Sequence, residues 1–482
     1  MKKYFLRKCV IAALLLVFAA PFPACNKLVQ VPPPSTTIAD NNVYTSDANA
    51  IAVITGIYEK MSGNSLAAPG DIPSLSLFAG LSADELTWWS GTPNVTMSAY
   101  YRNALSGVSG GAGSEYWAPL YNYIYSCNLA VEGLNASTGL TPAVKQQLLG
   151  EAHFLRGFFY FYLTNLFGNL PMPLSSDYTT NARLARVGTG TVYAQITADC
   201  QQAAALLNTS FVDGTLLGAS VERVRPTKWA AQALLARTYL YMGHSDSAAA
   251  EADSVIGNTG MFSLSPLATA FLRAGLGNNE AIWQLQPVNT GLNTEDAVAF
   301  IIPATGPGGA AGVYLSDQLL GSFEPGDQRR VAWTDSTVVA GTTYYYAYKY
   351  KVNTQGAPVT EYLTLLRLGE MYLVRSEARA MQGDLAGAAA DLNMIRARAG
   401  LGPSNAVSEQ DLLTAIWHER QVELFTELGH RWLDLKRTAR VDSVMGLVTP
   451  LKGGSWQSYQ QLYPLPPSEI QLDPNVVQNP GY

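Results

Sequence analysis

The chain contains the stretch GHSDSAAAEADSVI (Gly243–Ile256), which aligns without gaps with GDLAGAAADLNMIR (Gly383–Arg396) at an offset of 140 residues. Each copy follows a run rich in small and aromatic residues, ALLARTYLYM before the first and YLVRSEARAMQ before the second. A helix, a glycine-containing turn and an alanine-rich helix form the pattern of tetratricopeptide repeats, in which small residues let paired helices approach closely. The repeat therefore predicts a mostly α-helical scaffold, of a kind that usually presents an interaction surface.

Further helices are predicted on both sides of this repeat. The clearest opens at Thr141-Pro142, because threonine is a good N-cap and proline is favoured at the first helical position. Apolar residues then recur at helical spacing from Leu148 to Leu166, and Gly168 ends the run. We therefore expect a single domain over residues 44–482, with helical pairs near residues 141–208, 226–257, 361–400 and 408–441.

Two segments interrupt the helical pattern, residues 64–113 and 260–360. Both are rich in Gly, Pro, Asn, Ser and Thr and carry clusters of aromatic residues. Loops held on a rigid frame often carry binding sites, so we expect an irregular, β-containing face that binds a ligand. The run YYYAYKY at Tyr344–Tyr350 alternates as a β-strand would, and most of its rings are expected to pack on the helices.

Specific residues in these segments are candidates for ligand contact. Trp88 and Trp89 are adjacent, so in an extended loop they point to opposite sides and at least one is expected to be exposed. The candidate rings are Trp88, Trp89, Tyr101 and Trp333, and the candidate polar side chains are Asp84, Asn94 and Arg102.

The N-terminus has the form of a secretory signal. Four cations precede an apolar run of eleven residues, Val10–Ala20. That run is shorter than the roughly 20 residues that a transmembrane helix needs, and it fits a signal peptide. It leads to Ala24-Cys25, and a cysteine after a small residue at this point is where bacterial lipoproteins are cleaved and lipidated. We therefore predict a signal peptide over residues 1–24, lipid on Cys25 and a Pro-rich tether over residues 25–43; ordinary secretion remains the alternative.

The net charge of the mature chain bears on which partners it can bind. Removing residues 1–24 takes away four of the 31 Lys and Arg and none of the 37 Asp and Glu, so the mature chain has a net charge of −10. A net negative charge repels phosphate backbones and argues against a nucleic-acid partner.

Cys127 and Cys200 both lie in helical patterns and are expected to be buried free thiols, although one disulfide between them is also possible.

Three motifs raise the alternative of an enzyme. Ser109 lies in a G-x-S-x-G match, but the surrounding small-residue loop lacks the strand that a nucleophile elbow requires. His418-Glu419 begins a zincin-like pattern, but the second ligand position is Val422. No metal site, cofactor or catalytic residue is therefore predicted from either motif.

The third motif is a row of carboxylates, Glu419, Glu423 and Glu427, spaced four apart. Such a row could supply the acid pair of a glycoside hydrolase. Like charges at this spacing destabilise a helix, so we expect cations from neighbouring helices to neutralise them. The expected partners in this structural ion-pair network are Arg396, Arg398, Arg431 and Arg437.

Several longer segments resemble the SusD/RagB family, and the resemblance runs from the signal to the last residue. In chain order, the segments that carry it are TGIYEKM (Thr55–Met61), GEAHFLRGFFYFYLTNLFGNLPMP (Gly150–Pro173), YLVRSEARAMQGDLAGAAADLNMIRARAGL (Tyr372–Leu401), IWHERQVELFTELGHRWLDLKR (Ile416–Arg437), PLPPSEI (Pro464–Ile470) and VQNPGY (Val477–Tyr482).

This resemblance implies a lipoprotein on the outer face of a Gram-negative outer membrane. Members of the family are built on tetratricopeptide-like helices and form a lid on a SusC-like, TonB-dependent β-barrel transporter. They capture oligosaccharides, whose C–H faces pack on aromatic rings while the hydroxyls bind polar side chains. Some members bind peptides instead, so a peptide receptor and a surface glycoside hydrolase are kept as alternatives.

Overall fold

The computed structural model describes residues 40–91 and 93–482. The chain divides after Val43, and residues 44–482 form one compact unit. The predicted signal peptide, Cys25 and the tether up to residue 39 lie outside the described residues. The helices are η1 (Asp40–Thr45), α2 (Asp47–Gly63), α3 (Leu75–Ser82), α4 (Val95–Tyr101), α5 (Trp117–Ala136), α6 (Pro142–Phe167), α7 (Tyr178–Asn181), α8 (Thr189–Leu206), α9 (Lys228–Tyr241), α10 (Ser245–Ile256), η2 (Ala274–Leu276), α11 (Glu295–Phe300), α12 (Asp317–Leu320), α13 (Arg329–Ala332), α14 (Leu368–Met381), α15 (Leu385–Arg398), α16 (Glu409–Glu423), α17 (His430–Arg437), α18 (Val441–Leu451), η3 (Ser458–Gln461) and α19 (Pro467–Leu472).

The internal repeat folds as two equivalent helical hairpins. Helix α10 follows α9 through Gly243, and α15 follows α14 through Gly383. The two glycines have φ angles of 74° and 81°, a conformation that favours a residue without a side chain. Their amides donate to Leu240 and Ala380 carbonyls in corresponding positions, at 3.1 and 3.0 Å. The tetratricopeptide-like prediction is confirmed.

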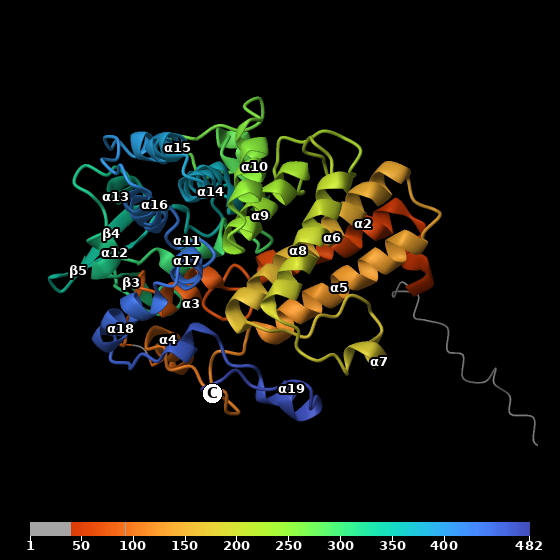
Figure 1. Cartoon of the computed structure of the whole chain (residues 1–482), viewed down its shortest axis with the longest axis horizontal. Coiled ribbons are helices and arrows are strands. Elements are labelled where there is room, and N and C mark those ends of the chain that lie inside the picture. Colours follow the sequence, from red (N-terminus) through yellow and green to blue (C-terminus); the bar gives the residue numbers. More distant parts are fainter. Residues whose placement is uncertain (1–39, 92) are drawn as a thin grey trace, which may run out of the picture. The chain divides into compact units, whose positions relative to one another are not determined.

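The larger helices pack in chain order, each against the next. The sequence of contacts runs from α5 and α6 through α8, α9 and α10 to α14, α15 and α16 (Figure 1). Helix α6 lies between α5 and α8 and is buried on nearly all sides. Close packing depends on small residues there: a Cβ added to Gly157 would lie 3.1 Å from the Cys200 sulfur. None of the described helices is long and apolar enough to cross a membrane.

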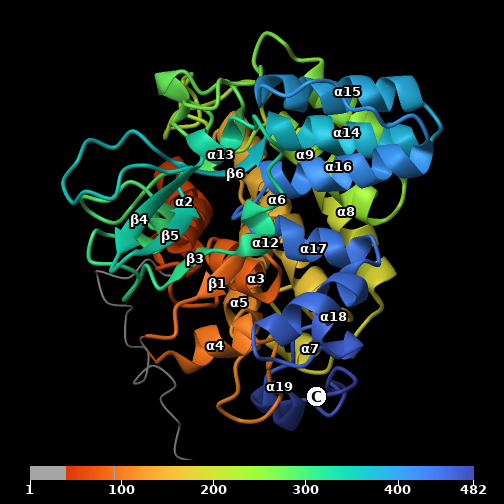
Figure 2. The same cartoon turned by 90° about the vertical axis from the view of Figure 1, so that its left-hand side faces the viewer.

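Strand structure in the described residues is limited to three antiparallel pairs. The strands are β1 (Leu86–Trp88), β2 (Ala281–Leu285), β3 (Val313–Leu315), β4 (Thr334–Val339), β5 (Thr342–Ala347) and β6 (Leu363–Arg367), which pair as β1–β3, β2–β6 and β4–β5. Figure 2 shows β3, β4 and β5 gathered next to β1, with α14, α15 and α16 grouped separately. The irregular, β-containing face predicted from the sequence is therefore present.

The β2–β6 pair corrects one helix boundary. The sequence pattern predicts a helix from Glu361, but residues Leu363–Arg367 form β6 and the helix starts at Leu368. A buried run such as LTLLR satisfies the apolar pattern of a helix and of a strand equally well. Its pairing partner, β2, lies far away in sequence and could not be inferred from local periodicity.

The two mature-chain cysteines in the described part of the protein are free and buried. Cys127 lies on α5 and Cys200 on α8, with α6 packed against both helices. Burial raises the pKa of the Cys127 thiol above its ordinary value. The expectation of buried free thiols is confirmed, and no disulfide joins them.

The row of glutamates belongs to a buried ion-pair network, as the sequence predicted. Glu423 accepts hydrogen bonds from Arg329 at 2.9 Å and from Arg367 at 2.5 Å, and it also pairs with Arg398. Burial alone would raise the pKa of Glu423, but the surrounding arginines outweigh it and hold that pKa well below its usual range. Glu423 is therefore ionised and structural.

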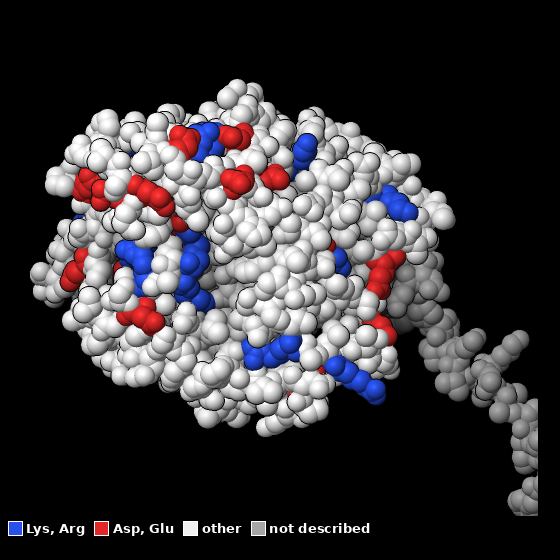
Figure 3. Space-filling model, in the orientation of Figure 1, with Lys and Arg blue, Asp and Glu red and all other residues white. Residues whose placement is uncertain are grey.

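The sequence predicted only some of the cations in this network. Arg396 and Arg398 contact Glu419 and Glu423 as expected. Arg431 and Arg437 do not, because Arg431 pairs with Asp84 and Arg437 pairs with Glu377 and Asp434. The missed partners are Arg329, Arg367 and Lys349, which come from the aromatic-rich segment and from β6. On the face in Figure 3, acidic and basic side chains lie near one another between wide uncharged areas.

Candidate functional site

Two partly exposed rings and one threonine come together where β1 meets β3. In this ladder Thr87 lies opposite Tyr314, while Leu86 lies opposite Leu315 and both leucines are buried. Side chains alternate between the two sides of a strand, so Thr87 and Tyr314 share the outer side. Trp89 follows on this side, because its backbone N–H continues the ladder by donating to Gly312 at 3.0 Å.

Helix α4 and strand β5 add two further rings. The Thr87 side chain lies close enough to the Tyr101 hydroxyl to offset part of the rise in the pKa of that phenol, and the Lys452 ammonium lies 5.3 Å from the Tyr101 ring centroid. The Tyr314 and Tyr344 rings meet edge to face with centroids 5.2 Å apart. We call the partly exposed rings of Trp89, Tyr101, Tyr314 and Tyr344 the aromatic face.

Two phenols of this face, those of Tyr101 and Tyr314, are uncharged near neutral pH. Partial burial raises the pKa of Tyr101, and burial together with the nearby phenols raises that of Tyr314. Neutral phenols can both donate and accept hydrogen bonds while their rings offer apolar surface. The aromatic face therefore combines ring surfaces with hydroxyl groups and carries no charge of its own.

Two of the predicted polar residues flank the aromatic face from α4. Asn94 is the N-cap of that helix, and its side-chain oxygen accepts the Met97 backbone N–H at 2.9 Å. Among residues 40–91 and 93–482, its NH₂ group has no hydrogen-bond partner. Arg102 follows the last turn of α4 and is exposed. Asp317, which the sequence did not single out, is exposed and close enough to Tyr314 to raise its pKa.

Three other predicted residues lie elsewhere. Trp88 projects to the opposite side of β1 from Trp89 and packs against the core. Asp84 is 4% exposed, and its carboxylate accepts two hydrogen bonds of 2.7 Å from Arg431. Burial would raise the pKa of Asp84, but the Arg431 guanidinium holds it below its ordinary value.

The expectation for Trp333 must be corrected. Its side chain is 0% exposed, its indole N–H donates to the Leu267 carbonyl at 2.9 Å, and its ring packs edge to face on Phe271. The Lys349 ammonium lies 5.0 Å from its centroid. No ring surface of Trp333 is open to a ligand, so it is a core residue next to the ion-pair network.

Tyr314 and Tyr344 are the residues of the aromatic face that the sequence analysis did not select. Tyr344 lay in a run whose rings were expected mainly to pack on the helices, and its neighbour Tyr346 is indeed buried. Tyr314 sits alone between small and aliphatic residues in the sequence. Alternation in β5 could have separated Tyr344 from Tyr345, but only the β1–β3 register brings Tyr314 to Thr87.

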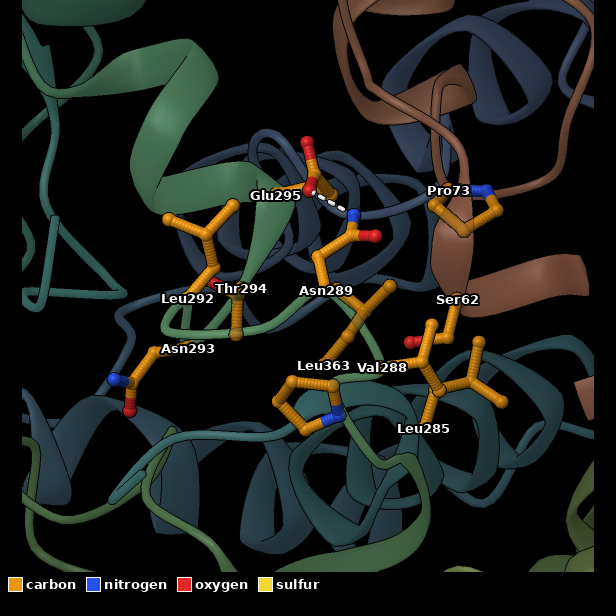
Figure 4. Close-up of a pocket in the computed structure, with 11 residues that line it drawn as sticks. Ser62, Pro73, Leu285, Val288, Asn289, Leu292, Asn293, Thr294, Glu295 and Leu363 are labelled. Atoms are coloured by element: carbon orange, nitrogen blue, oxygen red, sulfur yellow. Dashed lines mark hydrogen bonds between the residues drawn. The ribbon is translucent and has the colours of Figure 1, made fainter. Parts of the chain in front are cut away.

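Polar and apolar side chains together line a small pocket beside α2 (Figure 4). The Asn289 amide donates to Glu295 at 2.7 Å and also contacts the Gly63 carbonyl. With a volume of about 20 Å³, this pocket has room for one water molecule and none for a sugar. Two larger clefts, of about 570 and 600 Å³, flank α2 nearby, and none of the four rings of the aromatic face lines either of them.

One group of possible metal ligands converges in the described residues, formed by Glu324, His418 and Glu419. Arg396 already contacts both glutamates, at 2.5 and 3.4 Å. The His418 ring nitrogen lies 2.7 Å from the Ser322 carbonyl. The guanidinium supplies the positive charge between these carboxylates, so the group belongs to the ion-pair network.

The fold and the candidate site define a class of protein, a helical-repeat scaffold that carries a β-containing aromatic face. Comparison with known proteins then shows which family this chain resembles. Residues 332–482 match the SusD family model, and residues 81–240 match the model described as "Starch-binding associating with outer membrane". SusD-like protein P2 of Formosa agariphila is 26% identical over 100% of both chains. The starch-binding protein SusD of Bacteroides thetaiotaomicron is 34% identical over 125 residues, 25% of this chain and 21% of that protein.

A solved structure shows the same fold. A laminarin-binding SusD-like protein superposes with a TM-score of 0.73 at 23% identity, covering 91% of this chain and 100% of its own. The resemblance to the SusD/RagB family that the sequence segments indicated is confirmed by the two family models and by the full-length relative.

Proposed function

We propose that this protein binds oligosaccharide at the outer membrane and passes it to a transporter, and that the aromatic face is its binding site. The observation that carries this proposal is the grouping of four partly exposed rings around Thr87. Sugar rings expose C–H groups that pack on aromatic surfaces, and phenols together with Asn94, Arg102 and Asp317 can bind hydroxyls. The similarity to a laminarin-binding and a starch-binding protein supports a glycan as the ligand.

We propose that the protein binds glycan without hydrolysing it. A glycosidase needs two carboxyl groups beside the scissile bond, one of them protonated. Burial raises the pKa of Glu85 to about 8, which would suit a general acid, but Glu85 is 1% exposed and no sugar can reach it. Glu419, Glu423 and Glu427 are held in ion pairs. These observations favour a binding protein over the hydrolase alternative.

Calorimetric titration of the purified protein against a panel of neutral and acidic oligosaccharides tests this function. Two or three ring contacts, reduced by the entropy lost on association, predict dissociation constants between about 1 µM and 1 mM. A reducing-end assay on each mixture checks for hydrolysis. Release of new reducing ends would favour the hydrolase, and the absence of saturable binding to any glycan would exclude the proposed site.

Anchoring is expected to depend on Cys25. A Cys25→Ser protein should leave the membrane fraction, because a lipid on Cys25 is the proposed attachment and no described helix could replace it. Membrane and soluble fractions are compared by immunoblot in cells from which the transporter gene has been deleted. If the variant stays tightly bound to the membrane under those conditions, the lipoprotein assignment is wrong.

The transporter partner is proposed from the family. A SusC-like, TonB-dependent β-barrel in the outer membrane would receive the glycan, with this protein on the extracellular side. Extraction in mild detergent followed by affinity purification should recover the barrel and this protein in equal amounts, as quantified by mass spectrometry. Recovery of this protein alone, under conditions that keep another barrel–lipoprotein pair together, would count against the partnership.

A further inference from the structure

A cleft of about 570 Å³ runs beside α2, and we call it the α2 cleft. Its walls are the middle turns of α2 between Ile51 and Glu59, the loop of residues 212–225, and the end of β2 with the residues that follow it. The volume lies within the range of ligand pockets in proteins. Because it shares no residue with the aromatic face, the α2 cleft is available for a function separate from the proposed glycan site.

Aliphatic side chains form much of the α2 cleft. Ile51, Val212 and Val224 line it and are only partly buried, and Val288 at its mouth is 42% exposed. The same loop also exposes Leu217 and Val221 nearby. Apolar surface left open in this way favours a ligand that brings aliphatic groups of its own.

The charges in the α2 cleft are negative. The cationic Arg225 is neutralised by the buried Glu151, 2.9 Å away, and Glu222 is neutralised by Arg273 at 2.8 Å. Within the part of the chain that the structure describes, Glu59 and Asp213 take part in no ion pair, and both line the cleft. The uncompensated charge therefore favours a ligand with a cationic group.

Free backbone groups lie along one edge of the cleft. The backbone N–H of Gln284 donates to the Arg223 carbonyl at 2.9 Å, so the loop of residues 212–225 covers the outer edge of β2 at that point. Beyond it, the 286–288 backbone makes one hydrogen bond within residues 40–91 and 93–482, from the Ser62 hydroxyl to the Gln286 carbonyl. These residues follow β2 without forming a strand, and Pro287 has no N–H, so within the described part of the chain the groups left open are the Gln286 and Val288 N–H groups and the Pro287 and Val288 carbonyls. Open main-chain groups of this kind can bond to an extended chain.

We propose that the α2 cleft docks an extended segment of a partner protein that carries Lys or Arg next to aliphatic residues. Such a segment supplies the cation for Glu59 and Asp213, side chains for the aliphatic wall, and main-chain groups for residues 286–288. A glycan lacks the cation and the aliphatic side chains, and a polyamine lacks the main-chain donors and acceptors. A polypeptide meets all three requirements.

Fluorescence anisotropy with the full chain in detergent tests this docking. The probe is a labelled seven-residue peptide of alternating valine and lysine, with valine–glutamate and serine–lysine peptides for comparison. We expect saturable binding of the valine–lysine peptide only. The double variant Glu59→Gln with Asp213→Asn should weaken that binding about fivefold, because it removes two partly exposed ion pairs. Val288→Asp should weaken it by a similar factor.

Two matched variants serve as controls, Glu409→Gln at the start of α16 and Val407→Asp in the exposed loop before it. Both should bind the peptide as wild type does. Equal binding of the valine–glutamate peptide, or an unchanged affinity in the Glu59 and Asp213 double variant, would overturn the proposal. Displacement by spermidine at the peptide's own concentration would also overturn it, because a small cation would then suffice. Retained glycan binding in the cleft variants keeps this test independent of the proposed glycan site.

Discussion

Replacing Glu423 with alanine is expected to destabilise the protein by about 3–5 kcal/mol, the typical result of removing one partner from a buried ion pair. Glu423 is 0% exposed and accepts hydrogen bonds from Arg329, Arg367 and Arg398. Without its carboxylate, these guanidinium groups lose a shared counter-charge in a place that water does not reach. Denaturant titration of wild type and variant, followed by circular dichroism, measures the loss.

The effect should depend on pH with a defined sign. Because the folded-state pKa of Glu423 lies below its unfolded value, its contribution is present above the unfolded pKa and is lost as the pH falls through the folded pKa. The difference between wild type and Glu423→Ala should therefore be greatest near neutral pH and shrink in acid. Glu409→Ala, at an exposed position on the same helix, is the matched control and should change stability by less than about 0.5 kcal/mol. An unchanged unfolding midpoint in Glu423→Ala would refute the structural role.

Removing two rings of the aromatic face should weaken glycan binding at least about tenfold. We expect this for Trp89→Ala combined with Tyr314→Ala, because a ring contact contributes roughly 1 kcal/mol beyond the area that it buries. Both side chains are partly exposed, so their loss should leave the helical core folded. Calorimetric titration with the best ligand of the glycan panel measures the change, and the unfolding midpoint of each variant shows whether the fold is kept.

Other aromatic residues provide the contrast. Tyr178 on α7 is 79% exposed and outside the aromatic face, so Tyr178→Ala should bind glycan as wild type does. Trp333→Ala should act on stability, by about 3–5 kcal/mol, since it leaves a cavity beside Phe271. Full affinity in the Trp89 and Tyr314 double variant would show that glycan binds at another surface.

The helical frame could be predicted from the sequence because its signals are local. Gly243 and Gly383 mark equivalent turns, and helical spacing of apolar residues marks the helices on each side. The β2–β6 pair could not be predicted in the same way, because residues 281–285 meet residues 363–367 only after a long intervening segment. Local periodicity holds no information on such a pairing.

The candidate site was predictable only in part for a related reason. The sequence identified aromatic-rich segments correctly, but the exposure of each ring depends on distant contacts. Trp333 is covered through Leu267 and Phe271, and Asp84 is neutralised by Arg431, 347 residues away. Tyr314 joins Trp89 only through the β1–β3 register. The residue types in the sequence therefore indicated the chemistry of the candidate site, whereas tertiary packing determines which side chains are exposed in it.

The β2–β6 pair determines how the segment between its two strands is attached to the helical frame. Helices α10 and α14 pack directly on each other, although residues 257–367 separate them along the chain. The strand pair brings the two ends of residues 286–362 together, so this whole segment leaves and rejoins the frame at one point. Tyr314 and Tyr344 both lie within it. The same segment supplies Arg329 and Lys349 to Glu419 and Glu427, so any change in it that keeps the helical frame folded must keep those two cations.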